Sequence, residues 1–162
     1  DMSMFFNFSV GNKVYNANKI EFTTKYQYTD QNMFADMANR WKWFDGDLKI
    51  TDPTALAALN ANTTMWTPTA GNYFLHSYAI EDGSFLRLNN VTLGYSLGKD
   101  FTKQLGLSNF RLYFTMNNVF TITGYSGYDP EANTRRNPLT PGVDYAAYPR
   151  SRFILSGVDI TF

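Results

Sequence analysis

Four segments of the chain alternate between apolar and mostly polar side chains, one residue after the other. They cover residues 2–10, about 84–97, about 109–120 and 152–162. Alternation with a period of two is typical of a β-strand that has two different faces. The last segment shows it clearly, because Val158, Ile160 and the terminal Phe162 share one face. We therefore predict an all-β fold whose sheet contains four antiparallel strands.

The connections between these segments differ greatly in length. Residues 12–82 separate the first two segments and residues 121–150 the last two, whereas residues 98–108 join the middle pair. Compact soluble domains rarely contain such long loops, but transmembrane barrels combine short periplasmic turns with long extracellular loops. Each segment also has close to the roughly 9–11 residues that a tilted strand needs to cross a bilayer. This order predicts extracellular loops at 12–82 and 121–150, a periplasmic turn at 98–108 and a periplasmic C-terminus.

The composition agrees with a membrane barrel. Aromatic residues make up 17% of the chain, with 14 Phe, 11 Tyr and 3 Trp, and barrels use such residues as girdles at both membrane interfaces. No apolar run approaches the roughly 18 residues of a transmembrane helix. The 14 basic and 14 acidic side chains balance, which argues against a nucleic-acid partner. The absence of cysteine excludes disulfides and thiolate chemistry.

Four strands cannot close a membrane barrel by themselves. In lipid they would leave two edges of unpaired N–H and C=O groups, each of which costs several kcal/mol. The chain also begins at Asp1, with no initiator Met and no signal peptide. We therefore interpret it as a fragment or a processed piece of a larger barrel, with the missing strands upstream.

Two short helices are predicted within the first long loop. Asp52 and Pro53 precede residues 54–59 and suit a helix with an Asp cap and Pro at its first position. Residues 33–41 also place their apolar side chains at helical spacing.

Several stretches resemble one known family. Residues 82–95 (DGSFLRLNNVTLGY) closely resemble the signature near the end of SusC/RagA-type TonB-dependent outer-membrane transporters. Similar stretches follow in the same order at residues 111–120 (RLYFTMNNVF), 124–131 (GYSGYDPE), 142–152 (GVDYAAYPRSR) and 154–162 (ILSGVDITF), and upstream at 5–16 and Arg40-Trp41. The resemblance is strongest from Asp82 onward and weakest over residues 42–76. The family's N-terminal extension, TonB box, plug domain and earlier strands have no counterpart in this chain.

The resemblance implies that the chain supplies the last four strands of an outer-membrane barrel of about 22 strands. It also implies import of a large nutrient, typically a glycan or a peptide, energised by the inner-membrane TonB complex. A SusD-like surface lipoprotein that covers the barrel is the implied partner. Such a protein is a transporter and not an enzyme, and no cofactor is implied.

Aromatic and acidic side chains of the two long loops are the candidates for substrate contact. The candidates are Trp41, Trp43, Trp66, Tyr125, Tyr128 and Asp129. A tyrosine combines an apolar ring face with a hydroxyl and so suits sugars or peptides. The alternatives are loop packing or contact with the lid lipoprotein for the tryptophans, and a structural turn for residues 125–131.

The strands provide two further sets of candidates. Val158, Ile160 and Phe162 resemble the C-terminal signal read by the barrel-assembly machinery, which can pair with a terminal strand edge to edge. The residues expected to face membrane lipid are Phe6, Phe8, Val91, Leu93 and Leu112.

Evidence for metal binding or catalysis is sparse. Asp45, Asp47 and Asp52 could suggest a calcium loop, but they lack the regular alternation and closing Glu of an EF-hand, and a solvated turn is the better explanation. His76 is the only histidine, so a zinc site or a catalytic triad would depend on one residue. No GxSxG, P-loop or GxGxxG string occurs, and Asp129 with Glu131 would be a glycosidase pair only in principle.

Two other interpretations remain open at this point. A soluble carbohydrate-binding β-sandwich would also produce alternating strands and would use the aromatic residues as sugar platforms. An outer-membrane barrel enzyme or adhesin would place its activity in one of the long loops.

Overall fold

The computed structural model describes residues 1–24, 32–68, 77–134 and 141–162. The chain divides into two compact units, which are considered separately below. One unit comprises Asp1–Tyr15 and Glu81–Phe162, and the other comprises Asn16–Ile80.

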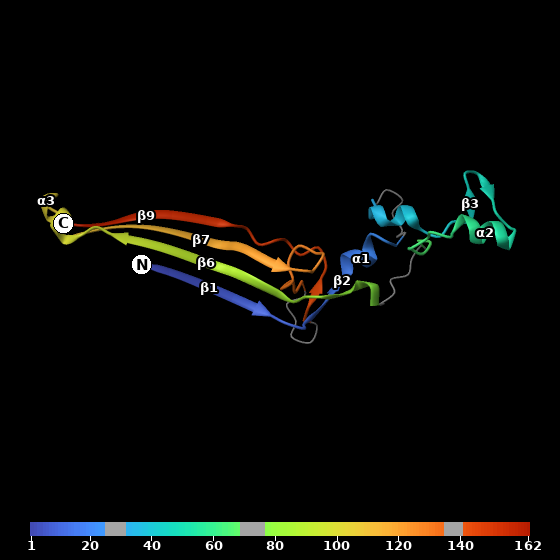
Figure 1. Ribbon diagram of the computed structural model, residues 1–162, viewed down its shortest axis with the longest axis horizontal. Coiled ribbons are helices and arrows are strands. Elements are labelled where there is room, and N and C mark those ends of the chain that lie inside the picture. The colour runs from blue at the N-terminus through green and yellow to red at the C-terminus, as the bar shows by residue number, and fades with distance from the viewer. Residues whose placement is uncertain (25–31, 69–76, 135–140) are drawn as a thin grey trace. The chain divides into compact units, whose positions relative to one another are not determined.

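The first unit contains an antiparallel sheet of four long strands (Figure 1). They are β1 (Met2–Ser9), β6 (Phe85–Ser96), β7 (Asn109–Thr123) and β9 (Phe153–Thr161). Long strands that follow one another in the chain pair with each other, so the sheet order is β1-β6-β7-β9. The predicted antiparallel β-structure is confirmed. Three of the strands lie within the predicted segments, and β7 continues to Thr123, past the predicted end near residue 120.

Irregularities interrupt the ladders at one level of the sheet. The register between β1 and β6 shifts between Phe5 and Phe6, and the register between β6 and β7 shifts between Leu88 and Asn90. Asn118 on β7 has a φ of 51°, a left-handed conformation in which Asn is enriched among non-glycine residues. An extra residue in one strand reverses its alternation, so Leu88 and Val91 lie on the same face although three positions separate them.

A small sheet adjoins the ends of the long strands. It consists of β2 (Lys13–Asn16), β5 (Ile80–Asp82) and β8 (Val143–Asp144), in the order β5-β2-β8. The Tyr15 N–H donates to the Gly142 carbonyl at 2.8 Å, and the Gly83 N–H donates to the Asn12 carbonyl at 2.9 Å. These bonds bring together three segments that lie far apart in the sequence.

The turn between β6 and β7 contains α3 (Lys99–Gln104), which the sequence did not predict. The helix begins after Gly98, and its Thr102 is buried. Gly106 ends it with a φ of 70°, while the Leu107 N–H donates to the Thr102 carbonyl at 2.9 Å. This left-handed glycine is a common way to end a helix.

The second unit consists of short elements. They are α1 (Ala17–Glu21), η1 (Ala35–Asn39), β3 (Phe44–Asp45), β4 (Leu48–Lys49), α2 (Pro53–Leu59) and η2 (Ser77–Ala79). The helix after Asp52 is confirmed, because the Asp52 carboxylate accepts a bond from the Ala55 N–H at 2.8 Å and Pro53 occupies its first turn. The helix expected over residues 33–41 is present only as the short 3₁₀ helix η1. None of the described helices is both long and apolar enough to cross a membrane.

Candidate functional surfaces

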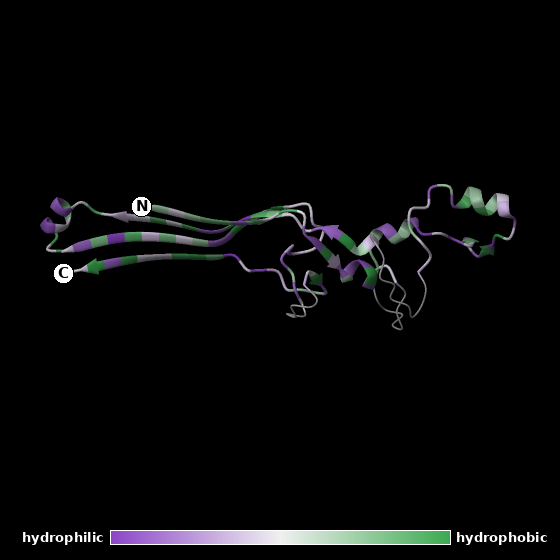
Figure 2. Cartoon of the chain, turned by 90° about the horizontal axis from the view of Figure 1, so that it is seen from below, coloured by the Kyte–Doolittle hydropathy of each residue, from purple (hydrophilic) through white to green (hydrophobic). Residues whose placement is uncertain are grey.

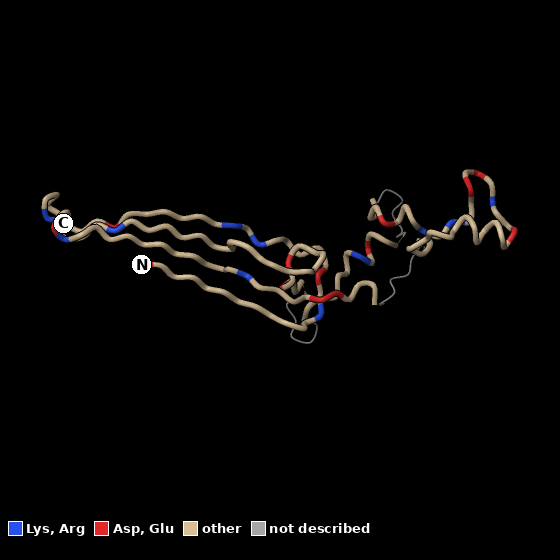
Figure 3. Tube along the Cα trace, in the orientation of Figure 1, with Lys and Arg blue, Asp and Glu red and all other residues tan. Residues whose placement is uncertain are grey.

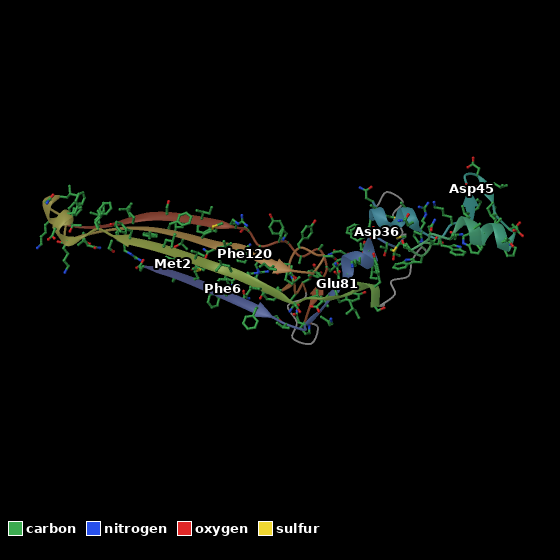
Figure 4. The ribbon with its side chains drawn as sticks, in the orientation of Figure 1. Met2, Phe6, Asp36, Asp45, Glu81 and Phe120 are labelled. Carbon is green, nitrogen blue, oxygen red and sulfur yellow. The ribbon has the colours of Figure 1, made fainter. Side chains whose placement is uncertain are left out.

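The strand register gathers apolar side chains on one face of the long sheet. One row across the sheet consists of successive cross-strand partners, namely Met4, Val91, Met116 and Ile154. The same alternation assigns further members, which are Met2, Phe6, Phe8, Leu86, Leu88, Leu93, Tyr95, Phe110, Leu112, Phe114, Phe120, Ile122, Val158 and Ile160. We call this set the apolar face, and Figure 4 labels three of its members, Met2, Phe6 and Phe120. The five residues predicted to face lipid all belong to it.

The apolar face has the dimensions of a membrane wall. From Phe110 to Ile122 on β7 it extends for about 40 Å along the strand, at about 3.3 Å per residue. A strand tilt of about 40–45° reduces this to roughly 30 Å along the bilayer normal, close to the thickness of the hydrocarbon core. Much of the face is exposed, with Phe8 at 72% and Tyr95 at 65%. Soluble monomers rarely expose such a large contiguous apolar patch.

The opposite face of the sheet is largely polar. The Asn90 side chain donates to the Asn117 Oδ1 at 2.7 Å, and the hydroxyls of Thr92 and Thr115 lie 3.1 Å apart. Figure 2 shows the resulting bands of polar and apolar residues along the long strands. Charged residues are rare on these strands and lie near their ends (Figure 3). One polar and one apolar face is the arrangement of a barrel wall around a polar lumen.

A tyrosine fills a gap on the polar face. The ring of Tyr113 occupies the space that a side chain at its cross-strand partner Gly157 would need. An aromatic ring that covers a glycine on the neighbouring strand helps to fix the register of a sheet.

Ion pairs tie residues 129–131 to the start of β6. Arg87 is only 2% exposed, and its guanidinium lies 2.6 Å from the Asp129 carboxylate and 3.0 Å from that of Glu131. Arg150 reaches the same two carboxylates at 3.2 and 3.3 Å. We call these four residues the arginine–carboxylate cluster. The Asn7 side chain of β1 donates to Glu131 at 3.2 Å, so the cluster connects two strands with two parts of the loop.

A second buried contact ties the same loop to the small sheet. The Tyr125 hydroxyl donates to the Asp144 carboxylate at 2.7 Å, and both residues are buried. Burial, together with the bond to the Asp144 carboxylate, raises the pKa of Tyr125 well above its usual range. The Tyr125 ring also occupies the space that a side chain at Gly127 would need.

The predicted contact residues of this loop therefore differ in their environments. Tyr125 and Asp129 are both 6% exposed, and their polar atoms are bonded to Asp144 and Arg87. These contacts favour the structural turn that the sequence left open. Tyr128 lies between them in the chain but is 76% exposed, so its ring can reach a ligand.

The predicted tryptophans lie in the second unit and take part in aromatic pairs. The rings of Trp41 and Trp43 meet edge to face with centroids 6.3 Å apart, and those of Trp66 and Tyr78 do so at 5.1 Å. Trp43 remains 49% exposed and Trp66 37% exposed. Each of these two side chains is therefore packed on one side and accessible on another.

The structure supports the turn interpretation of the possible calcium loop. Asp45 pairs with Leu48 in the β3–β4 hairpin, where Gly46 has a φ of 58°, and Asp52 caps α2. Within the described ranges, no group of three or more His, Cys, Asp or Glu side chains could hold a metal ion. His76 lies outside the described residues.

The sequence did not reveal a groove in the first unit. The groove has a volume of about 480 Å³, and its walls come from β1, β2, the start of β6 and residues 130–133 and 141–142. Three lining residues, Asn7, Ser9 and Phe85, belong to the polar face, and one, Phe8, belongs to the apolar face. No local pattern marks such a site, because its walls come together only through long-range contacts.

Several TonB-dependent receptors are similar to this chain in sequence. No protein-family model matches it. It is 34% identical over its full length to TonB-dependent receptor P3 of Formosa agariphila, of which it spans 15%. It is also 36% identical, over 55% of its length, to TonB-dependent receptor SusC of Bacteroides thetaiotaomicron, of which the match spans 8%. The chain is related to the SusC/RagA-type TonB-dependent receptors. This confirms the family resemblance that its motifs indicated.

Solved structures of a RagAB importer share the fold. The structure of the RagAB peptide importer in the closed-closed state matches 99% of this chain with a TM-score of 0.71 at 23% identity. A second structure, of the RagAB peptide transporter, matches the same share with a TM-score of 0.70 at 22% identity. The chain spans 15% and 16% of those two proteins. The relatives at 34% and 36% identity are named as receptors, which fits the expectation that this chain does not belong to an enzyme.

Proposed function

We propose that this chain forms the last four strands in the wall of an outer-membrane, TonB-dependent importer of large nutrients. The observation that carries the proposal is the two-faced sheet, whose apolar face is continuous across four strands and matches the thickness of a bilayer. Similarity to TonB-dependent receptors over the full length of the chain supports the same function.

The edges of the sheet support its place within a larger barrel. β1 and β9 form the two edges of the long sheet, and in lipid an unpaired edge is strongly unfavourable. We propose that further strands pair with both edges to complete a barrel of about 22 strands. Residues 12–82 and 121–150 would then be extracellular, with residues 98–108 and the C-terminus in the periplasm.

The two faces of the sheet receive different roles in this proposal. The apolar face contacts membrane lipid, and the polar face lines the lumen through which a glycan or an oligopeptide passes. Energy comes from the TonB complex, and a SusD-like lipoprotein covers the extracellular side. Tyr128, Trp43 and Trp66 contact the substrate or this partner, because their rings remain accessible.

Strand β9 has a further role during assembly. Val158 and Ile160 point to the apolar face of an edge strand, and Phe162 follows them at 88% exposure. An edge strand offers unpaired backbone groups to a partner. We propose that these three residues form the signal that the barrel-assembly machinery reads.

A soluble carbohydrate-binding module fits the structure less well. Such a module would have to cover the apolar face with a second layer, as in a β-sandwich. Within the described residues of the first unit, many large side chains of this face, such as Phe8 and Ile122, remain exposed.

Nutrient uptake by cells that carry the complete receptor tests the proposed function. Labelled oligosaccharides and peptides are offered to three samples of cells. One carries the gene for the complete receptor, one lacks it, and one carries it but has its proton gradient collapsed. We expect uptake of one nutrient class to require both the gene and the gradient. Uptake that persists without TonB coupling would contradict the proposal and would favour a barrel enzyme or adhesin.

A further inference from the structure

We propose that the groove in the first unit is a ligand subsite for a neutral, hydroxyl-rich segment of an oligosaccharide. This inference rests on the proposed function, because it places a substrate contact on the lumen side of the barrel wall. At about 480 Å³ the groove falls within the roughly 300–1,000 Å³ that is typical of small-molecule sites.

Amide and hydroxyl groups line the groove beside a small apolar surface. Its polar side chains include Asn7, Ser9, Asn12 and Asn133, and its apolar residues include Phe85. The Asn7 amide is already bonded to Glu131 and Asn89, so the amide contacts with a ligand are assigned to Asn12 and Asn133. An asparagine amide offers donors and an acceptor together, which matches sugar hydroxyls, since each of these also donates and accepts.

One of these amides lacks a hydrogen bond. The Oδ1 atom of Asn12 is buried and has no partner among the described residues. Buried polar atoms are nearly always bonded in folded proteins, so an orphaned acceptor at the groove wall is consistent with a donor supplied by a ligand. A sugar hydroxyl is such a donor.

The charges at the groove are compensated within the protein. Glu131 is paired with Arg87 and Arg150, and the Lys13 ammonium lies 3.3 Å from the Asp82 carboxylate. Bonds from Ser84, with a smaller contribution from Lys13, lower the pKa of Asp82 to about 2, so this carboxylate is ionised at neutral pH. With no uncompensated charge among these groups, the groove favours a neutral ligand over the charged ends of a peptide.

The walls of the groove are held in place before a ligand arrives. The arginine–carboxylate cluster fixes Glu131, while the Gly142 carbonyl accepts the Tyr15 N–H at 2.8 Å. Gly142 has a φ of 71°, and a Cβ there would lie 3.0 Å from the Lys13 carbonyl. Walls ordered in advance reduce the entropy lost on binding.

The test uses the complete receptor, purified in detergent, and two probe mixtures. One mixture contains neutral oligosaccharides from partly hydrolysed plant and algal polysaccharides, and the other is a tryptic digest of casein. Mass spectrometry identifies what the protein retains. Asn133→Trp fills the groove from an exposed position, and Tyr148→Trp is the matched control, because Tyr148 is 90% exposed and does not line the groove.

We expect the unaltered receptor and the Tyr148→Trp control to retain neutral oligosaccharides, and Asn133→Trp to retain about tenfold less, as expected for the loss of one or two hydrogen bonds. The proposal would be overturned if the unaltered receptor retained only peptides or retained nothing from either mixture. It would also be overturned if Asn133→Trp and Tyr148→Trp retained equal amounts of oligosaccharide. Uptake by cells is measured in parallel. If uptake still depends on TonB while Asn133→Trp has no effect, the subsite is wrong and the proposed function stands.

Discussion

Arg87 shows how a single residue can set the path of the loop between β7 and β9. It is 2% exposed and lies beside two carboxylates. A charge buried this deeply is tolerated only when it is paired and hydrogen-bonded. The cluster therefore fixes where residues 129–131 contact the strands, and the exposed ring of Tyr128 precedes this fixed point.

Removal of one carboxylate from the cluster should loosen the loop. Asp129→Ala leaves Arg87 buried with only part of its pairing, and breaking such a pair typically costs about 3–5 kcal/mol. Hydrogen exchange measured on the complete receptor should show faster exchange for amides 124–134. Lys13→Ala, which removes an exposed ion pair with Asp82, is the control and should change exchange little. Unchanged protection in Asp129→Ala would contradict the structural role of the cluster.

The Tyr125 hydroxyl should stabilise the loop across the neutral range. Tyr125→Phe removes its bond to the buried Asp144 carboxylate, which should cost about 1–3 kcal/mol. Because the pKa of Tyr125 is raised in the folded state, this contribution is complete below the unfolded pKa of about 10 and is lost only as pH rises through the folded pKa. The loop should therefore be cleaved faster in Tyr125→Phe than in the parent, and this difference in the rate of proteolysis should be the same at pH 7 and pH 9. A difference that disappears between these two values would show that the bond is not the cause.

A charge placed on the apolar face should destabilise the barrel more than a charge on the polar face. Val91 lies in the middle row of the face, so Val91→Arg should destabilise the barrel by about 2–4 kcal/mol, as expected for a cation facing lipid at the bilayer centre. Ser3→Arg is the control, because Ser3 belongs to the neighbouring row on the polar face. Denaturant unfolding of the complete receptor in lipid vesicles measures both variants. Equal losses of stability would contradict the assignment of the two faces.

Strand β9 permits a similar comparison of adjacent residues. Ile160→Asp places a charge on the apolar face, whereas Thr161→Asp places it on the polar face one residue later. If β9 carries the assembly signal, Ile160→Asp should lower the amount of folded receptor in the outer membrane severalfold, and Thr161→Asp should lower it much less. Folded receptor is quantified by its altered mobility on gels before heating. Equal amounts for the two variants would contradict this role.

At the level of the whole molecule, the second unit is an insertion in the sequence between the first two long strands of the first unit. The two ends of the first unit that flank it lie close together, because Gly83 bonds to Asn12 and Asp82 pairs with Lys13. The four long strands pair only with one another within the described residues. The proposed barrel wall would therefore be expected to assemble without a strand from the second unit.

Replacement of residues 17–79 by a short Gly/Ser linker should accordingly leave a receptor that still assembles. Loop closure costs little extra free energy when the ends are already close. Gel mobility before heating should remain that of a folded barrel, while nutrient uptake should fall, because Trp43 and Trp66 are removed. Failure of the shortened receptor to reach the outer membrane would show that the second unit is needed for folding.

The sequence alone determined the long strands, because alternation between two environments is a local pattern that each strand carries by itself. The Asp52 cap was predictable for the same reason, since its bond reaches only three residues along the chain. The faces could not be followed through a whole strand, because the irregularity near Asn89 reverses the alternation of β6. Only the tertiary structure decided that point.

The arginine–carboxylate cluster and the groove also required the tertiary structure. Arg87 and Asp129 are 42 residues apart, and Asn7 and Glu131 are 124 apart. Arginine and carboxylate side chains occur throughout the chain, and no spacing indicates which of them meet. Their partners are selected when the strands pair and the loop returns over the polar face, because only then does burial make an unpaired charge or amide unfavourable.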